Sequence, residues 1–132
     1  MTTDMCPCGS GKRHASCCGP ALSGQANAGT AEALMRSRYS AYVTQNIPYL
    51  KETLWPKNRT GIDEEAAAQW ARENHWTGLT VLDVKKGGKT DREGTVLFEA
   101  KYLAGGTLNT HRELSRFRKK AGRWYYVEAI VE

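Results

Sequence analysis

The spacing of apolar residues predicts helices in the first half of the chain. Over residues 31–43 they recur every three or four positions, the period of an amphipathic helix. Thr30 directly precedes this segment and can cap it, since its hydroxyl can accept a free backbone N–H. A short helix is expected after Pro48, and Asp63 predicts the N-cap of a third helix that runs to Glu73.

From Trp76 onward the pattern changes to the alternation that is typical of strands. Apolar residues occupy every second position from Val96 to Tyr102. Turns are predicted at the glycines of 87–88, 105–106 and 121–122, which divide this half into strands over 77–86, 94–104, 108–119 and 123–131. Successive hairpins make an antiparallel meander, so we expect an α+β fold with helices packed on one face of a curved sheet.

Size and charge narrow the class of protein. A chain of 132 residues suits one ordinary domain with a small appendage, and no segment has the ~20 apolar residues of a membrane span. The first five residues do not resemble a secretory signal, so we expect a cytoplasmic protein. The net charge of +5 is moderate and favours a solvated surface over nucleic-acid binding, which is the less favoured partner.

All four cysteines lie within thirteen residues, at Cys6, Cys8, Cys17 and Cys18. Two pairs at the ends of a short Gly-containing loop can close a tetrahedral shell of four thiolates around Zn²⁺. Free thiols, a disulfide and His14 as a replacement ligand are alternatives, but cytosolic thiols stay reduced and His14 is expected at the surface. We therefore predict one structural Zn²⁺, because a catalytic zinc would need an open coordination position.

The composition also predicts how the chain is divided. Residues 19–29 contain mostly glycine, alanine, serine and asparagine, which is typical of a linker. We expect a zinc knuckle over 1–20, a flexible linker over 21–29 and the α+β domain over 30–132.

The cysteine segment closely resembles the SEC-C motif, known from the C-terminus of the SecA translocation ATPase. The resemblance implies the four cysteines as ligands; SecA-type copies often end in histidine where this chain has Cys18. The knuckle of SecA is an interaction surface, so the resemblance implies a protein partner. Lys12, Arg13 and His14 would form the basic edge that meets it.

The rest of the chain resembles the YchJ family of bacterial proteins. The resemblance implies a cone-like fold similar to nuclear transport factor 2, which agrees with the predicted helices and meander. The stretches that carry it are residues 34–42, Tyr49-Leu50, 53–56 with Arg59, 113–117 and 122–126.

Candidate site residues follow from the inward positions. His111 and Glu113 share a face of the third strand with Phe117, and Arg38 lies in the apolar stripe of the first helix. In one hypothesis His111 and Glu113 are an acid/base pair, with Arg38 or Arg59 binding an anion. In the favoured one Arg38 and Glu113 form a structural ion pair. We therefore expect a non-catalytic zinc-binding interaction module, with a possible small ligand in the cone; the alternative is a small-molecule enzyme.

Overall fold

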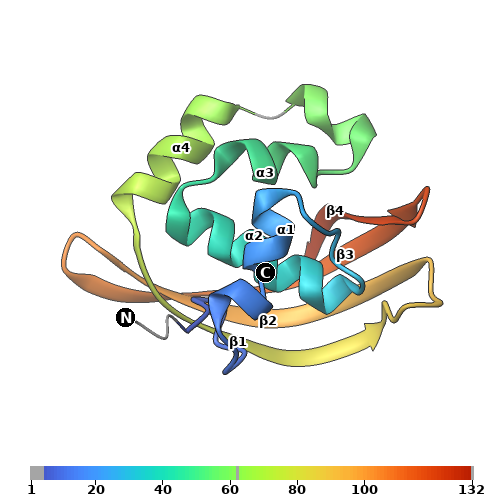
Figure 1. The fold of residues 1–132 in the computed structure, drawn as a ribbon. Helices are drawn as coiled ribbons and strands as arrows, with labels where there is room; N and C mark the ends of the chain where they lie inside the picture. Colours follow the sequence, from blue (N-terminus) through green and yellow to red (C-terminus); the bar gives the residue numbers. More distant parts are fainter. Residues whose placement is uncertain (1–4, 62, 132) are drawn as a thin grey trace.

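The computed structural model describes residues 5–61 and 63–131, with the side chains of 59–61 and 131 left out of the description. Four antiparallel strands form one curved sheet in the order β1-β2-β3-β4, and the helices lie over its concave face (Figure 1). This arrangement confirms the predicted α+β class. The strands are β1 (His75–Lys86), β2 (Glu93–Ala104), β3 (Thr107–Lys120) and β4 (Arg123–Val131).

The curvature of the sheet has a local origin in shifts of strand register. The pairing of β1 with β2 shifts between Trp76 and Gly78 and again between Val81 and Asp83. The pairing of β3 with β4 shifts twice near Ser115. Such irregularities bend the bulged strand and increase its twist, so the long strands curl around the helices.

One helix fills the concave face of the sheet. This helix, α2 (Ala31–Thr44), begins where predicted, and the Thr30 hydroxyl accepts a 3.0 Å hydrogen bond from the backbone N–H of Ala33. Its buried residues Leu34 and Met35 belong to the same core as Val96, Phe117 and Trp124 of the sheet. The apolar stripe of the sequence therefore faces the strands.

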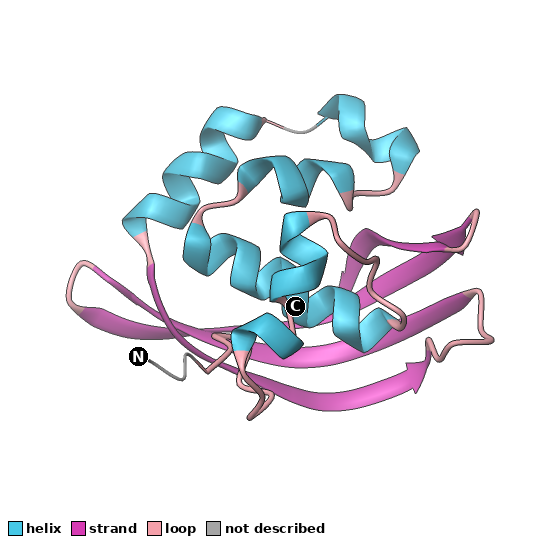
Figure 2. Cartoon of the chain, viewed as in Figure 1, coloured by secondary structure: helices cyan, strands magenta, loops and turns pink. Residues whose placement is uncertain are grey.

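Two further helices form an outer layer above α2 (Figures 1 and 2). They are α3 (Ile47–Glu52) and α4 (Glu64–Glu73), joined through the 3-10 helix η2 (Pro56–Gly61). Asp63 caps α4 as predicted, accepting a 3.0 Å bond from the N–H of Ala66. Among the described residues, every helix is too short or too polar to cross a bilayer.

The segment predicted as a linker contains a short helix. After the 3-10 turn η1 (His14–Ser16), α1 (Gly19–Ser23) begins at the end of the predicted knuckle and extends into residues 21–23. Gly24, with φ of 84°, ends it in the left-handed conformation that glycine adopts easily. Leu22 and Ala28 pack against the core, so this segment runs along the surface of the domain.

Residues after α3 cover part of the outer edge of the sheet. The N–H of Trp55 donates to the carbonyl of Tyr126 at 2.8 Å, and the N–H of Tyr126 donates to the carbonyl of Thr53 at 2.8 Å. Leu54 thereby forms a parallel bridge with β4. This pairing holds α3 close to the inward residues of β4.

Candidate functional site

The sulfur atoms of all four cysteines come together at the N-terminus. They lie within 4.8 Å of one another, with Cys8 and Cys17 at 3.6 Å and Cys17 and Cys18 at 3.9 Å. Four thiolates at about 2.3 Å from a tetrahedral metal would be about 3.8 Å apart. All four cysteines are free thiols, so the cluster could hold a metal ion.

Tight turns bring the two cysteine pairs together. Gly9 and Gly11 have φ of 77° and 83°, which other residues rarely adopt. The turn η1 then returns the chain to Cys17 and Cys18. A β-carbon on Gly9 would lie 3.1 Å from the carbonyl oxygen of Leu79, so this turn packs closely against β1.

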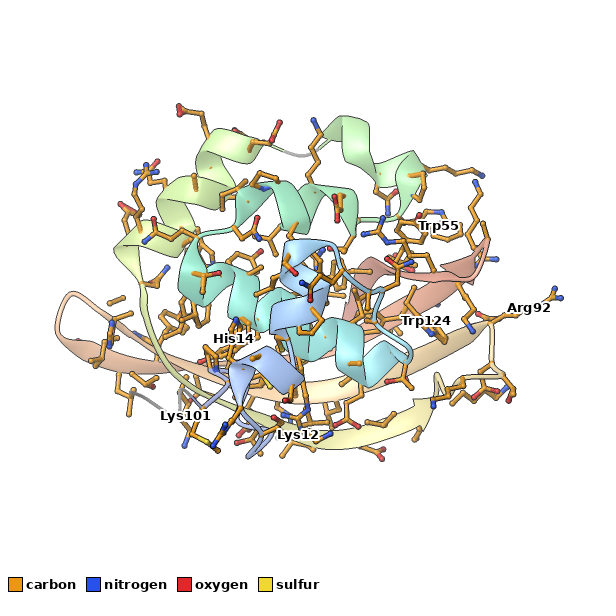
Figure 3. The ribbon with its side chains drawn as sticks, in the orientation of Figure 1. Lys12, His14, Trp55, Arg92, Lys101 and Trp124 are labelled. Atoms are coloured by element: carbon orange, nitrogen blue, oxygen red, sulfur yellow. The ribbon has the colours of Figure 1, made fainter. Side chains whose placement is uncertain are left out.

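Polar side chains surround the sulfur atoms. The hydroxyl of Ser10 lies 3.1 Å from the sulfur of Cys17, and the hydroxyl of Ser40 on α2 lies 3.6 Å from that of Cys6. His14, expected at the surface, is half-buried with its Nδ1 at 3.4 Å from the sulfur of Cys6. Figure 3 shows His14 and Lys12 on the knuckle in front of the sheet. Such groups fix the orientation of ligand atoms around a metal.

Burial and mutual hydrogen bonds set the protonation of the cluster. The pKa of Cys8 is lowered to about 4, chiefly because the thiol of Cys18 donates a hydrogen bond to its thiolate. That same bond, together with burial, raises the pKa of Cys18, and burial raises the pKa of Cys17. A divalent cation that binds all four sulfurs must therefore displace thiol protons.

The knuckle is fixed to the helical layer. Arg36 of α2 donates from Nη1 to the carbonyl oxygen of Cys8 at 2.8 Å, while its Nε pairs with Glu32 at 2.9 Å. Cys6, Cys8 and Cys18 belong to the same buried cluster as the apolar residues of α2 and the sheet. A metal bound here would thus lie at the edge of the main hydrophobic core.

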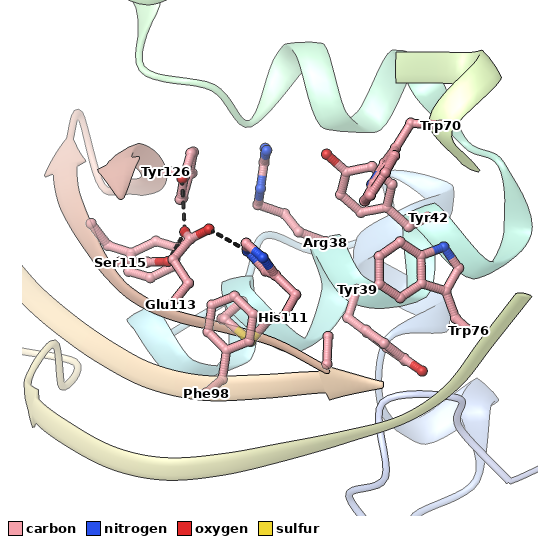
Figure 4. Close-up of a pocket in the computed structure, with 13 residues that line it drawn as sticks. Arg38, Tyr39, Tyr42, Trp70, Trp76, Phe98, His111, Glu113, Ser115 and Tyr126 are labelled. Atoms are coloured by element: carbon pink, nitrogen blue, oxygen red, sulfur yellow. Dashed lines mark hydrogen bonds and ion pairs between the residues drawn. The ribbon is translucent and has the colours of Figure 1, made fainter. Parts of the chain in front are cut away.

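A second feature is a partly open cavity of about 140 Å³ between α2, α4 and the concave face of the sheet (Figure 4). It brings together three of the predicted residues, Arg38, His111 and Glu113. The side chain of Arg59, the fourth candidate, lies outside the described residues.

Glu113 is the centre of a hydrogen-bond network in this cavity. Its Oε2 accepts from the hydroxyl of Ser115 and, at 2.8 Å, from the hydroxyl of Tyr126. Its Oε1 lies 2.9 Å from Nε2 of His111. Burial, and then the nearby charge of Glu113, raises the pKa of Tyr126. His111 and Glu113, which the sequence placed on one inward face of the strand, are therefore in hydrogen-bond contact.

The sequence favoured a direct ion pair between Arg38 and Glu113, and no such pair is formed among the described residues. Nη1 of Arg38 instead donates to the carbonyl of Leu50 at 2.9 Å and to the hydroxyl of Thr53 at 2.7 Å. The guanidinium carbon lies 4.6 Å from the ring centroid of Tyr126, whose hydroxyl binds Glu113. Burial lowers the pKa of Arg38. Acceptors at the end of α3 thus take the place of the carboxylate.

The aromatic wall of the cavity was not assigned to the site from the sequence. The ring of Trp76 has its centroid 5.7 Å from that of Tyr42 and 6.1 Å from that of Trp70, and all three rings line the cavity. The ring of Tyr102, which is not part of the lining, has its centroid 5.2 Å from that of Trp76. These residues come from four different elements. The inward positions of Tyr42 and Tyr102 were visible in the periodicity, but the pairing of the elements was needed to bring the rings together.

Two family models match the chain. Residues 30–129 match the model described as YchJ, middle NTF2-like domain, and residues 3–20 match the SEC-C motif. The chain belongs to the YchJ family. Both resemblances expected from the sequence are thereby confirmed.

Relatives of the YchJ family share most of this chain. A UPF0225 protein from Geobacter sulfurreducens is 44% identical over 126 residues, which cover 96% of this chain and 78% of the relative. The solution structure of a SEC-C motif containing protein from Rhodopseudomonas palustris is 41% identical with a TM-score of 0.88, covering 96% of this chain and 98% of that one. The crystal structure of a SEC-C motif containing protein from Psychrobacter arcticus is 32% identical with a TM-score of 0.82, covering 96% and 82%.

Proposed function

We propose that this YchJ-family protein is a non-catalytic binding protein stabilised by one structural Zn²⁺. The observation that carries the proposal is the spacing of the four cysteine sulfurs, which suits a tetrahedral shell. Thiolates are soft ligands that favour zinc over hard cations. Four sulfur ligands leave no coordination position for water, which supports a structural role. The reduced thiols that zinc needs persist in the cytoplasm, where we place the protein.

Metal content and thiol titration test the zinc site. Protein purified without added metal should contain one zinc per chain, with all four thiols masked until a chelator is added. The variant Cys17→Ser should hold zinc more weakly, because it removes one sulfur ligand. Protein without metal and with four reactive thiols would overturn the proposal.

The binding role is proposed for the basic edge of the knuckle. Lys12 and Arg13 are exposed, and their side chains make no ion pair within the described part of the chain. Two free cations attract an acidic partner and help to orient it. The solved relatives carry the same motif by name, which supports a shared use of this element. We therefore propose an acidic protein segment as the partner.

Charge reversal tests this partner. The double variant Lys12→Glu/Arg13→Glu should no longer copurify with the partner that wild-type protein captures, while its zinc content stays at one per chain. The matched control is Lys85→Glu/Lys89→Glu, which changes the charge equally at exposed residues of β1 and its following turn. If wild type and the Lys12/Arg13 variant captured the partner equally, the proposal would be wrong.

A second candidate function is proton transfer in the cone cavity. The hydrogen bond of 2.9 Å between His111 and Glu113 favours it, because a carboxylate can fix the orientation of an imidazole that transfers a proton. A thermal-shift screen of small molecules would find ligands of the cavity, and an assay of their conversion would then separate the two functions. A ligand that is converted by wild type and by neither His111→Ala nor Glu113→Gln would identify an enzyme; ligands bound without conversion would favour the binding protein.

A further inference from the structure

The size of the cone cavity limits what it can hold. Its volume of about 140 Å³ is well below the range of roughly 300–1,000 Å³ that is typical of sites for drug-sized molecules. An apolar cavity of about 150 Å³ in an engineered protein takes up benzene. The cavity therefore suits one six-membered ring with a small substituent.

The walls of the cavity favour a flat ligand. Tyr42, Trp70 and Trp76 line it on one side of Arg38, and Tyr126 lies on the other side (Figure 4). Phe98 forms part of the floor on β2. Ring faces and edges of this kind pack well against a planar unsaturated molecule.

The spare hydrogen-bonding groups of the lining are mainly donors. Glu113 already accepts from Ser115, Tyr126 and His111, which uses three of its roughly four lone-pair directions. Both described hydrogen bonds of Arg38 come from Nη1, which leaves the N–H groups of Nε and Nη2 for a ligand. The indole N–H of Trp76 is also buried without a partner, but it lies on the side of the ring that faces away from Arg38 (Figure 4). A ligand that completes this lining must accept hydrogen bonds.

The charge of Arg38 also favours a ligand that accepts hydrogen bonds. Arg38 is half-buried and makes no direct ion pair among the described residues, and its protein acceptors, the Leu50 carbonyl and the Thr53 hydroxyl, are neutral. The carboxylate of Glu113 lies in the same cavity, but Tyr126 contacts both side chains and Glu113 accepts its hydrogen bonds from other groups. A cation that is partly removed from water without an anion in direct contact is costly, and an anion placed beside it offsets that cost. The planar fork of a guanidinium matches a carboxylate with two parallel hydrogen bonds.

We infer that the cone cavity binds a small planar carboxylate, with the carboxylate at Arg38 and the ring against Trp76. This inference rests on the use of the cavity as a ligand site, as in the second candidate function, but it requires no catalysis. It is also independent of the partner proposed for the knuckle.

Benzoate is a suitable probe for the zinc-loaded full chain. Titration followed by NMR should shift the indole N–H signal of Trp76 in a saturable way. Benzamide keeps the ring and removes the charge, and cyclohexanecarboxylate keeps the charge and removes the planar ring. Benzamide should bind about tenfold more weakly, since a charged hydrogen bond exceeds a neutral one by about a factor of ten in affinity. Cyclohexanecarboxylate should also bind more weakly, because its puckered ring packs less well against the aromatic walls. Benzamide binding as tightly as benzoate, or no saturable shift of Trp76, would overturn the inference.

A variant locates the charge recognition. Arg38→Lys keeps the positive charge but loses the fork, so benzoate should bind about tenfold more weakly. Arg112→Lys is the matched control on the exposed part of β3, and it should bind as wild type does. Equal binding by a folded Arg38→Lys variant would overturn the role of Arg38; if that variant does not fold, the three-ligand comparison on wild type decides. Benzoate that binds while no substrate is converted would reject only the enzyme.

Discussion

At the scale of the residue, two glycines let the β1–β2 hairpin approach α2. A β-carbon on Gly94 would lie 2.5 Å from the α-carbon of Gly87, and one on Gly87 would lie 2.7 Å from the β-carbon of Ala31. The carbonyl of Gly87 accepts a 2.9 Å hydrogen bond from the N–H of Ala31. The first turn of α2 is therefore attached to the hairpin at a place without room for a methyl group.

We expect Gly94→Ala to lower the free energy of unfolding by about 1–3 kcal/mol, because the new methyl group forces the backbone at Gly87 to move. Gly78→Ala is the control within β1, since a β-carbon there meets nothing within 4 Å. Urea denaturation of both variants measures the difference. Equal stability of the two variants would contradict the close packing at Gly94.

Ionisation of the buried Tyr39 hydroxyl should lower the free energy of unfolding at high pH. Burial raises the pKa of Tyr39 to about 12, against about 10 in the unfolded chain. Between these values the folded state binds more protons, so the stability that Tyr39 contributes is complete below pH 10 and is lost as the pH rises toward 12. The loss is about 2–3 kcal/mol, at about 1.4 kcal/mol per pH unit.

Denaturation of wild type and Tyr39→Phe at several pH values tests this contribution. The difference in unfolding free energy between the two proteins should be constant up to pH 10 and should then shift in favour of the variant. Other groups that titrate in this range affect both proteins alike. Parallel curves between pH 10 and 12 would show that Tyr39 does not carry the effect.

The sequence predicted the direction of the inward residues better than their partners. Helical spacing placed Arg38 on the buried stripe, and the period of two placed Glu113 beside His111. Both partners of Arg38 lie on or just after α3, at Leu50 and Thr53. Such contacts depend on how two helices pack, which a pattern within one helix does not specify.

At the scale of the element, turn signals and alternation were enough for the sheet. The predicted strand starting at 77 begins at His75 in the structure, and the one over 123–131 has the same bounds. The helix α1 was missed because its residues are small and show no apolar period. It is held by tertiary contacts, with Leu22 packed against the core and Gly24 as its end.

The contact between α2 and the knuckle should strengthen metal binding. Arg36→Met removes the hydrogen bond of 2.8 Å to the carbonyl of Cys8, which fixes the loop that carries two of the four cysteines. Loss of a group that orients ligands costs about 10–100-fold in metal affinity, so we expect zinc to bind at least about tenfold more weakly. Competition with a chromophoric chelator measures this affinity.

Glu32→Gln is the matched control for Arg36→Met. It removes the ion pair with Nε of Arg36 and leaves the bond from Nη1 to Cys8 in place. Its zinc affinity should stay close to that of wild type, since an exposed ion pair contributes little. If both variants bind zinc as wild type does, the docking of the knuckle on α2 has no part in holding the metal.

At the scale of the whole molecule, the knuckle and the cone share one core. Three cysteines, Cys6, Cys8 and Cys18, are buried in the same cluster as Leu34 of α2. The Gly9 turn also lies close to the backbone of β1 at Leu79. A knuckle on a free linker would unfold alone, but a knuckle that forms one wall of the core would couple the binding of the proposed metal to the stability of the sheet and helices.

Removal of zinc should therefore destabilise the entire protein in one transition. Metal binding by a site that exists only in the folded state contributes directly to folding, and each kcal/mol lost lowers the midpoint of a domain of this size by about 3–6 °C. We expect a chelator to lower the calorimetric midpoint by about 10 °C or more while a single peak remains. Cys17→Ser should have a lower midpoint from the start and respond less to the chelator. Two separate peaks, with the larger one unmoved by the chelator, would instead show a knuckle that folds independently of the cone.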